Sequence, residues 1–170
     1  KEFKDFKLSY SSIKDKNFRI AGKIDLHDLS LQIPSLNYSK DEKTKADVDF
    51  YIDSSKSGYD IGRLLYSSGK SKIELDKVIL NKNSEIKDIR NIKIATFRNG
   101  LINNNFRIGK HENLKNTIFV MGELLDAEPL LKSLYKKSVG NKMLSNAFNS
   151  KIKVNLERVI TGTDDDVSNF

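Results

Sequence analysis

Apolar and polar residues alternate with a period of two along most of this 170-residue chain. In NFRIAGKIDL, residues 17–26, apolar side chains recur at alternate positions and charged side chains lie between them. Successive side chains of a strand point to opposite faces, so this pattern predicts a half-buried antiparallel strand. The same alternation recurs over residues 46–53, 91–97, 101–109 and 116–122.

The inward-facing apolar positions of the predicted strands are candidates for an ordinary β-core or for contact with an apolar ligand such as an acyl chain. Periodicity alone does not separate the two roles, because both require the same apolar face, and a core is the more frequent one. The candidate positions are Phe18, Ile20, Ile24, Leu26, Val48, Phe50, Ile52, Ile73, Leu75, Ile92, Ile94, Phe106, Ile108, Ile118 and Val120.

Turn signals separate the predicted strands at lengths typical of a meander. The pair Asn99-Gly100 tolerates positive φ angles and predicts a tight hairpin between the strands on either side. SSGKS at 67–71 and TGTDDD at 161–166 indicate further turns. We therefore expect strands that follow one another in the sequence to pair antiparallel.

Three stretches share one pattern of apolar, polar, Leu, two polar residues and apolar again. They are IDLHDLSL at 24–31, IELDKVIL at 73–80 and VNLERVIT at 154–161. Two consecutive polar residues shift the alternation by one position, as a β-bulge or a corner does. The pattern predicts corner-turning strands near 20–34, 71–80 and 152–161, and their unequal spacing does not fit a solenoid with one fixed unit.

The stretch 126–148 interrupts the β pattern. Asp126 suits the N-cap of a helix, Pro129 suits its first turn, and Leu130 and Leu134 recur at helical spacing. One or two short helices are therefore expected here. Such an insert would cover part of the sheet or close one of its edges.

Many one-sided strands and very little helix define the predicted fold, which is mostly β. We expect an antiparallel meander of twisted strands that forms an open groove or a half-closed sandwich, because few helices are available to cover the apolar face. An apolar surface left open in solution is normally occupied by something apolar. The hydrophobic content of 38% suffices for one sizeable core.

The composition argues against several kinds of chemistry. There are no cysteines, and the two histidines stand far apart, which leaves no metal-ligand spacing. GKS at 69–71 lacks the upstream glycine of a phosphate-binding loop, and TDDDV at 163–167 lacks the ligand spacing of a calcium loop. No nucleophile motif is present, so we predict no enzymatic activity, no metal and no cofactor.

A net charge of +7 raises the alternative of a nucleic acid or another polyanion as partner. The lysines are scattered along the chain, however, and the motifs that interleave basic and aromatic residues for nucleic-acid binding are missing. We therefore expect no nucleic-acid partner. No apolar run reaches the roughly 18 residues of a membrane span, so any anchor would lie outside this chain.

Two longer motifs occur in a characteristic order, GKIDLHDLSLQIPSLNYSK at 22–40 and FVMGELLDAEPLLKSL at 119–134, followed by VNLERVITG at 154–162. Together they resemble the AsmA-like family of bacterial envelope proteins, in particular its large YhdP-type members. The residues that match are Gly22, Asp25, Leu26, Leu31, Pro34, Tyr38, Ser39, Lys40, Gly122 and 125–131, and Leu29 stands where the family usually has a small residue.

The resemblance implies a specific function. Relatives are anchored in the inner membrane by an N-terminal helix and extend through the periplasm as a long β-groove that conducts phospholipids toward the outer membrane. By this likeness, residues 1–170 are an excerpt of a longer repetitive β-groove protein that supports outer-membrane assembly. The candidate inward residues would then contact acyl chains. The alternative is a non-catalytic scaffolding module that binds other envelope proteins.

Overall fold

The computed structural model of the chain describes residues 6–13, 17–110, 117–135, 151–162 and 167–168. Its elements in chain order are β1 (Phe6–Ile13), β2 (Asn17–Asp25), β3 (Leu31–Ile33), η2 (Pro34–Leu36, a 3₁₀ turn), β4 (Tyr38–Lys40), β5 (Asp47–Ser55), β6 (Gly58–Ser68), β7 (Ser71–Asn81), β8 (Ile86–Arg98), β9 (Leu101–Lys110), β10 (Thr117–Asp126), α1 (Glu128–Tyr135), β11 (Lys151–Ile160) and β12 (Val167–Ser168).

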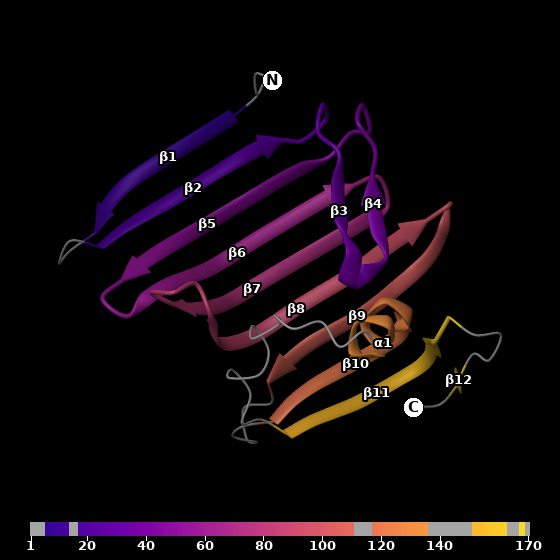
Figure 1. Cartoon of the computed structure of the whole chain (residues 1–170). Coiled ribbons are helices and arrows are strands. Elements are labelled where there is room, and N and C mark those ends of the chain that lie inside the picture. The colour runs from indigo at the N-terminus through magenta and orange to yellow at the C-terminus, as the bar shows by residue number, and fades with distance from the viewer. Residues whose placement is uncertain (1–5, 14–16, 111–116, 136–150, 163–166, 169–170) are drawn as a thin grey trace.

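Ten of the described strands form one twisted sheet in the order β1-β2-β5-β6-β7-β8-β9-β10-β11-β12 (Figure 1). The outermost strands, β1 and β12, do not pair with each other, so the sheet is open. Neighbours from β1 to β10 pair antiparallel. The structure therefore confirms the predicted fold, which is mostly β, mostly antiparallel and open.

One pairing departs from the predicted meander, because β10 and β11 run parallel. A parallel neighbour requires a connection long enough to return to the starting end of the sheet, and an antiparallel hairpin does not provide one. Helix α1 belongs to the stretch of chain between β10 and β11. The part of the predicted 126–148 insert beyond residue 135 lies outside the described residues.

Two turns match their sequence signals closely. Arg98 pairs with Leu101, and the intervening Asn99 and Gly100 have φ angles of 51° and 79°. Positive φ at both central positions produces the twist that a two-residue hairpin needs, which explains the Asn-Gly pair. Gly69, in the turn between β6 and β7, likewise has a φ of 56°.

The three repeated stretches differ in structure. In the first, β2 ends at Asp25 and the chain leaves the large sheet. In the second, β7 continues without interruption, but Lys77 has a φ of 53° and the alternation shifts there, so that Ile73 and Val78 are both buried. In the third, Leu156 in β11 is buried and Val159 also packs against the core, again with a shift between them.

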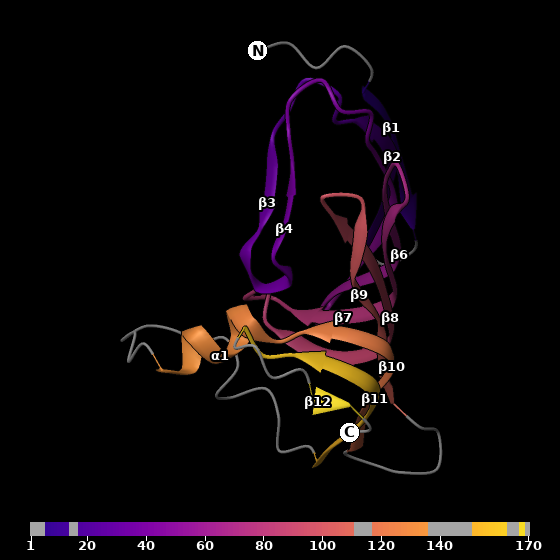
Figure 2. The same ribbon diagram turned by 90° about the vertical axis from the view of Figure 1, so that its right-hand side faces the viewer.

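The chain between β2 and β5 forms a flap, defined here as β3, η2 and β4 (31–40). Figure 2 shows the flap in front of one face of the sheet, toward which β10 and β11 curve. We call this face the inner face. Leu31, Ile33 and Leu36 of the flap pack against a buried cluster. The members of this cluster are Tyr38, Ala46, Tyr66, Ile73, Ile94, Phe106 and Leu156.

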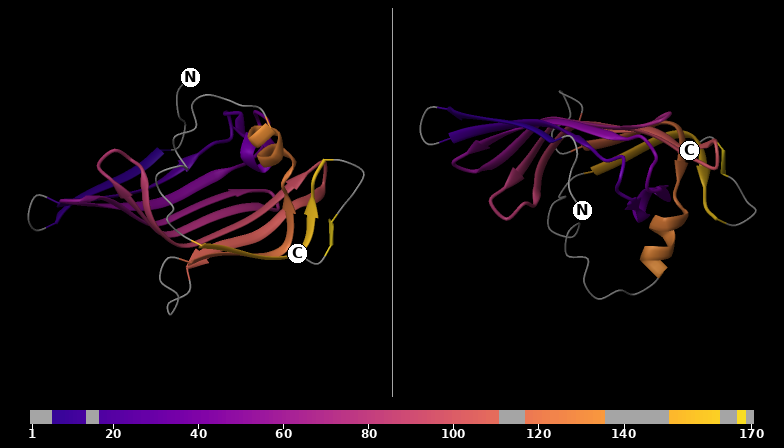
Figure 3. Two further views of the ribbon diagram at one scale, coloured as in Figure 1. Left: turned by 60° about the horizontal axis from the view of Figure 1, so that its bottom comes forward. Right: turned by 90° about the horizontal axis from the view of Figure 1, so that it is seen from above.

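Helix α1 leaves the end of β10 on the inner side and contacts η2 (Figure 3). The backbone N–H of Glu128 donates to Asp126 Oδ1 at 3.2 Å, and Leu131 N donates to Ala127 O at 2.9 Å. Asp126 therefore caps the first turn, as its sequence position indicates. The layer that covers the core is the flap.

Candidate functional site

The fifteen predicted inward positions lie on or beside the inner face. Directly paired residues of neighbouring strands share a face. Ile20 pairs with Ile52, and Ile24 with Val48. A second row runs across the sheet, with Leu75 opposite Ile92, Ile92 opposite Ile108, and Ile108 opposite Val120. Leu26 follows β2 directly and packs against the core cluster.

The candidate positions divide into two groups by exposure. Ile73, Ile94, Phe106 and Ile118 are 4–8% exposed, and the first three belong to the core cluster beneath the flap. Core packing accounts for their apolar character, and this conformation leaves them little surface for a ligand. The other eleven are half-buried. Contact between any of them and a lipid stays a prediction.

One part of the inner face that the flap leaves uncovered lies on β1, β2, β5 and β6. Tyr10 is 67% exposed and Leu8 is 52% exposed, and the Tyr10 ring stacks on Phe18 with their centroids 5.8 Å apart. Half-buried apolar side chains outside the core cluster continue from there. This open apolar zone consists of Leu8, Tyr10, Phe18, Ile20, Phe50, Ile52, Ile61 and Leu64.

Four members of the open apolar zone were not among the predicted inward positions. Leu8 and Tyr10 lie in FKLSYSSI, whose alternation of apolar and polar residues over 6–11 was the available signal. Ile61 and Leu64 lie on either side of a register shift between β5 and β6, so they occupy odd and even positions although both face inward. The shift moves the apolar positions by one, which a strict period of two cannot detect.

A buried polar network fastens the tip of the flap to the sheet. Asn104 is fully buried, and its Nδ2 donates to Leu36 O at 2.8 Å and to Thr96 Oγ1 at 3.0 Å. Its Oδ1 accepts the backbone N–H of Asp126 at 2.9 Å. Asn37 at the flap tip donates through Nδ2 to Asp126 Oδ2 at 2.8 Å. We call these residues, together with Asn103, the latch.

Every latch group that faces the interior has a partner. Thr96 Oγ1 donates to Asn103 Oδ1 at 2.9 Å, and Asn103 Nδ2 donates to Leu36 O at 3.1 Å. A fully satisfied buried network favours one arrangement of the chain, because any other leaves desolvated groups unpaired. The run of three asparagines at 103–105 is unusual for strand residues and was the available signal for this role.

Two further polar contacts hold the flap. The hydroxyls of Tyr38 and Tyr66 form a hydrogen bond of 2.8 Å within the core cluster, and their rings meet edge to face. Burial, followed by the hydrogen bond with Tyr38, raises the pKa of the Tyr66 phenol. Lys40, only 4% exposed, donates through Nζ to the carbonyls of Leu29 and Asp41. These residues of the YSK motif thus serve structural roles.

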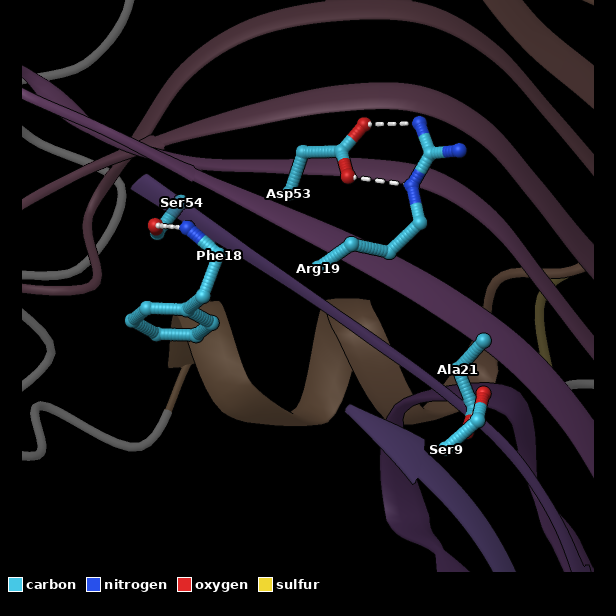
Figure 4. A network of polar contacts seen from close by, with 6 residues as sticks. All are labelled: Ser9, Phe18, Arg19, Ala21, Asp53 and Ser54. Carbon is cyan, nitrogen blue, oxygen red and sulfur yellow. Dashed lines mark hydrogen bonds and ion pairs between the residues drawn. The ribbon is translucent and has the colours of Figure 1, made fainter. Parts of the chain in front are cut away.

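The opposite, outer face is polar and charged. Phe18 and Arg19, neighbours in β2, point to opposite faces (Figure 4). Arg19 donates through Nε and Nη2 to the two carboxylate oxygens of Asp53, both at 2.6 Å. This hydrogen-bonded pair lowers the pKa of Asp53. The Arg19 guanidinium also lies 5.2 Å from the centre of the Tyr51 ring.

Two other outer-face cations have carboxylate partners. Lys23 lies 3.6 Å from Asp47, and Lys93 lies 3.7 Å from Glu74. Lys70, in the turn between β6 and β7, stands over the Phe97 ring. Cations are therefore dispersed among carboxylates and aromatic rings on this face, as expected for a solvated surface.

Within the described ranges, no group of three or more His, Asp or Glu side chains could hold a metal ion. No helix in that part of the chain is long and apolar enough to cross a membrane. A scan against protein-family models finds no match, and searches of curated proteins and of solved structures find no similar protein. The functional conclusion therefore depends on the geometry of the inner face and on the sequence motifs.

Proposed function

We propose that this chain binds phospholipid acyl chains along the inner face and forms one segment of a periplasmic β-groove that conducts lipids between the inner and outer membranes. The observation that carries the proposal is the open apolar zone, which continues the apolar core surface beyond the flap. The proposed periplasmic location and the choice of phospholipid as ligand come from the resemblance to AsmA-like proteins. Anchoring in the inner membrane would come from regions outside this chain.

The chemistry of the open apolar zone suits an acyl chain. Burial of one methylene group contributes about 0.8 kcal/mol, so a chain that lies across several strands is held by many small contacts. The zone consists of aliphatic and aromatic side chains without a precisely placed polar group at its centre. Such a surface binds without a steep energy minimum, which permits lipids to slide along it.

Exposure at the edge of the sheet supports the same proposal. A soluble protein rarely leaves a contiguous apolar surface uncovered unless a ligand or a partner occupies it. Tyr10 and Leu8 are more than half exposed on the inner face at the β1 edge, and Ile152 is 59% exposed next to the inward Ile118. Apolar surface is therefore exposed on both sides of the flap.

Native mass spectrometry of the 170-residue chain, purified without detergent from a bacterial envelope fraction, tests the proposal. We expect protein ions that carry one or more phospholipid masses, released on collisional activation. A matched pair of variants sharpens the result, with Ile52→Asp on the inner face and Leu65→Asp on the outer face, since both side chains are half-buried.

The charged group should interrupt the acyl-chain surface only in the inner-face variant. We therefore expect Ile52→Asp to lose most of the bound lipid and Leu65→Asp to retain it. A wild-type chain that carries no lipid, or two variants that retain it equally, would contradict the proposal.

A further inference from the structure

A hollow with a volume of about 450 Å³ lies at one end of the open apolar zone. It is formed where β2 begins, β5 and β7 end, and β6 begins, so two tight turns contribute to its rim. Phe18 belongs both to this hollow and to the open apolar zone. The described residues that line the hollow are Asn17, Phe18, Ser54, Ser55, Lys56, Gly58, Tyr59 and Lys82.

Two aromatic side chains and a serine define the inner part of the hollow. The backbone N–H of Phe18 donates to Ser54 Oγ at 2.7 Å, and Ser54 is directly opposite Tyr59 across the β5–β6 pair. Ser54 Oγ accepts this bond, so its hydroxyl hydrogen remains free to donate to a ligand. Two residues further along β2 and two residues back along β5, Ile20 and Ile52 form the next pair on the same face.

The rim of the hollow is cationic. Lys56 in the β5–β6 turn and Lys82 in the β7–β8 turn are both exposed, and no ion pair joins either to a described residue. None of the described lining residues is acidic. Three described carboxylates lie nearby in the chain. Asp53 binds Arg19, and Glu85 accepts from Asn81 Nδ2 at 2.7 Å. Asp60 pairs with Asp53 across β5 and β6, so it lies on the outer face, away from the hollow.

We propose that this hollow binds the phosphate headgroup of an anionic phospholipid whose acyl chains lie on the open apolar zone. The inference rests on the proposed function, because it assigns a headgroup class to the same surface. Lys56 and Lys82 supply two ammonium groups, Ser54 supplies a hydroxyl donor, and Phe18 and Tyr59 flank the glycerol region.

The charges favour an anionic headgroup over a zwitterionic one. A zwitterionic headgroup brings a positive amine or choline next to its phosphate, and the lining contains no described carboxylate to receive it. A headgroup with a phosphate and neutral hydroxyls has no such group to accommodate. The hollow therefore discriminates lipids by net charge, whereas the apolar zone does not discriminate between them.

Binding of fluorescent phosphatidylglycerol and phosphatidylcholine with identical acyl chains, to the 170-residue chain at moderate salt, tests the inference. We expect phosphatidylglycerol to bind about tenfold more tightly, and the double variant Lys56→Gln/Lys82→Gln to reduce that preference to about twofold. Affinity for phosphatidylcholine should stay unchanged. Competition with glycerol phosphate distinguishes a lipid headgroup site from a site for free phosphate. We expect glycerol phosphate at the same concentration as the lipid not to displace it. Displacement would mean that the hollow binds free phosphate and would overturn the headgroup site.

Lys45→Gln/Lys70→Gln is the matched control, because it removes the same charge at the opposite ends of β5 and β6. We expect the control to keep the tenfold preference. Equal loss in both double variants, or a wild type without preference, would overturn the headgroup site while lipid binding itself still supports the proposed function. If neither lipid binds to the wild type or to either double variant, both the headgroup site and the proposed function are contradicted.

Discussion

Replacement of Leu156 by alanine is expected to reduce the free energy of unfolding by about 3 kcal/mol. Leu156 is 1% exposed, lies at the centre of β11 and belongs to the core cluster that includes Phe106 and Tyr38 of the flap. Truncation removes buried methyl groups and leaves a cavity between the flap and the sheet. Chemical denaturation monitored by circular dichroism measures the loss.

Ile152→Ala is the control for this prediction. Ile152 lies on the same strand and is 59% exposed, so truncation there should cost about 1 kcal/mol or less. Equal losses in the two variants would mean that β11 is not attached to the core through Leu156. Such a result would contradict the description of the flap and sheet as one packed unit.

Replacement of Asn104 by alanine should release the flap. The substitution removes three hydrogen bonds and leaves Leu36 O, Thr96 Oγ1 and the Asp126 N–H without this partner in a buried site. Unsatisfied buried groups are costly, so we expect a loss of about 3 kcal/mol in the free energy of unfolding. Hydrogen exchange should accelerate over the flap, residues 31–40, more than over β6 and β7.

The neighbouring Asn105→Ala provides the matched control. Asn105 Nδ2 donates to Glu123 Oε2 at 2.6 Å in an exposed contact on the outer face. Its loss should change stability by about 0.5 kcal/mol and leave exchange in the flap unaltered. Flap exchange that is insensitive to Asn104→Ala would show that the latch does not hold the flap.

Alternation of apolar and polar residues sufficed to predict most of the large sheet. Strands such as β2, β5 and β9 have an apolar inner face and a polar outer face, so the period of two is preserved in their sequences. The Asn99-Gly100 hairpin was predictable for a similar reason, because its backbone angles restrict the residues that fit there. These features follow from local chemistry.

The flap was not predicted, because its strands β3 and β4 have only three residues each. IDLHDLSLQIPSL looks like one strand with a corner, although the chain leaves the sheet after Asp25 and η2 interrupts it at Pro34. What holds the flap is tertiary packing on Tyr66 and the latch, which involves residues distant in sequence. The parallel β10–β11 pair was missed for the same reason.

The candidate lining was predicted in part. All fifteen positions lie on or beside the inner face, which explains why they are apolar. The periodicity of the sequence could not show which of them belong to the core and which to the open surface. That division depends on where the flap lies, and the flap covers Ile73, Ile94 and Phe106. The hollow could not be predicted from the sequence either, because Lys56 and Lys82 belong to separate turns that the sheet brings together.

The central claim is that acyl chains occupy the inner face of the sheet. Site-specific photo-cross-linking tests it most directly, with benzoylphenylalanine in place of Ile20 on the inner face or of Lys23 on the outer face of the same strand. After irradiation in cells that contain radiolabelled phospholipid, we expect labelled protein from the Ile20 position and none from the Lys23 position. Equal labelling at both positions, or no labelling at Ile20, would contradict the account.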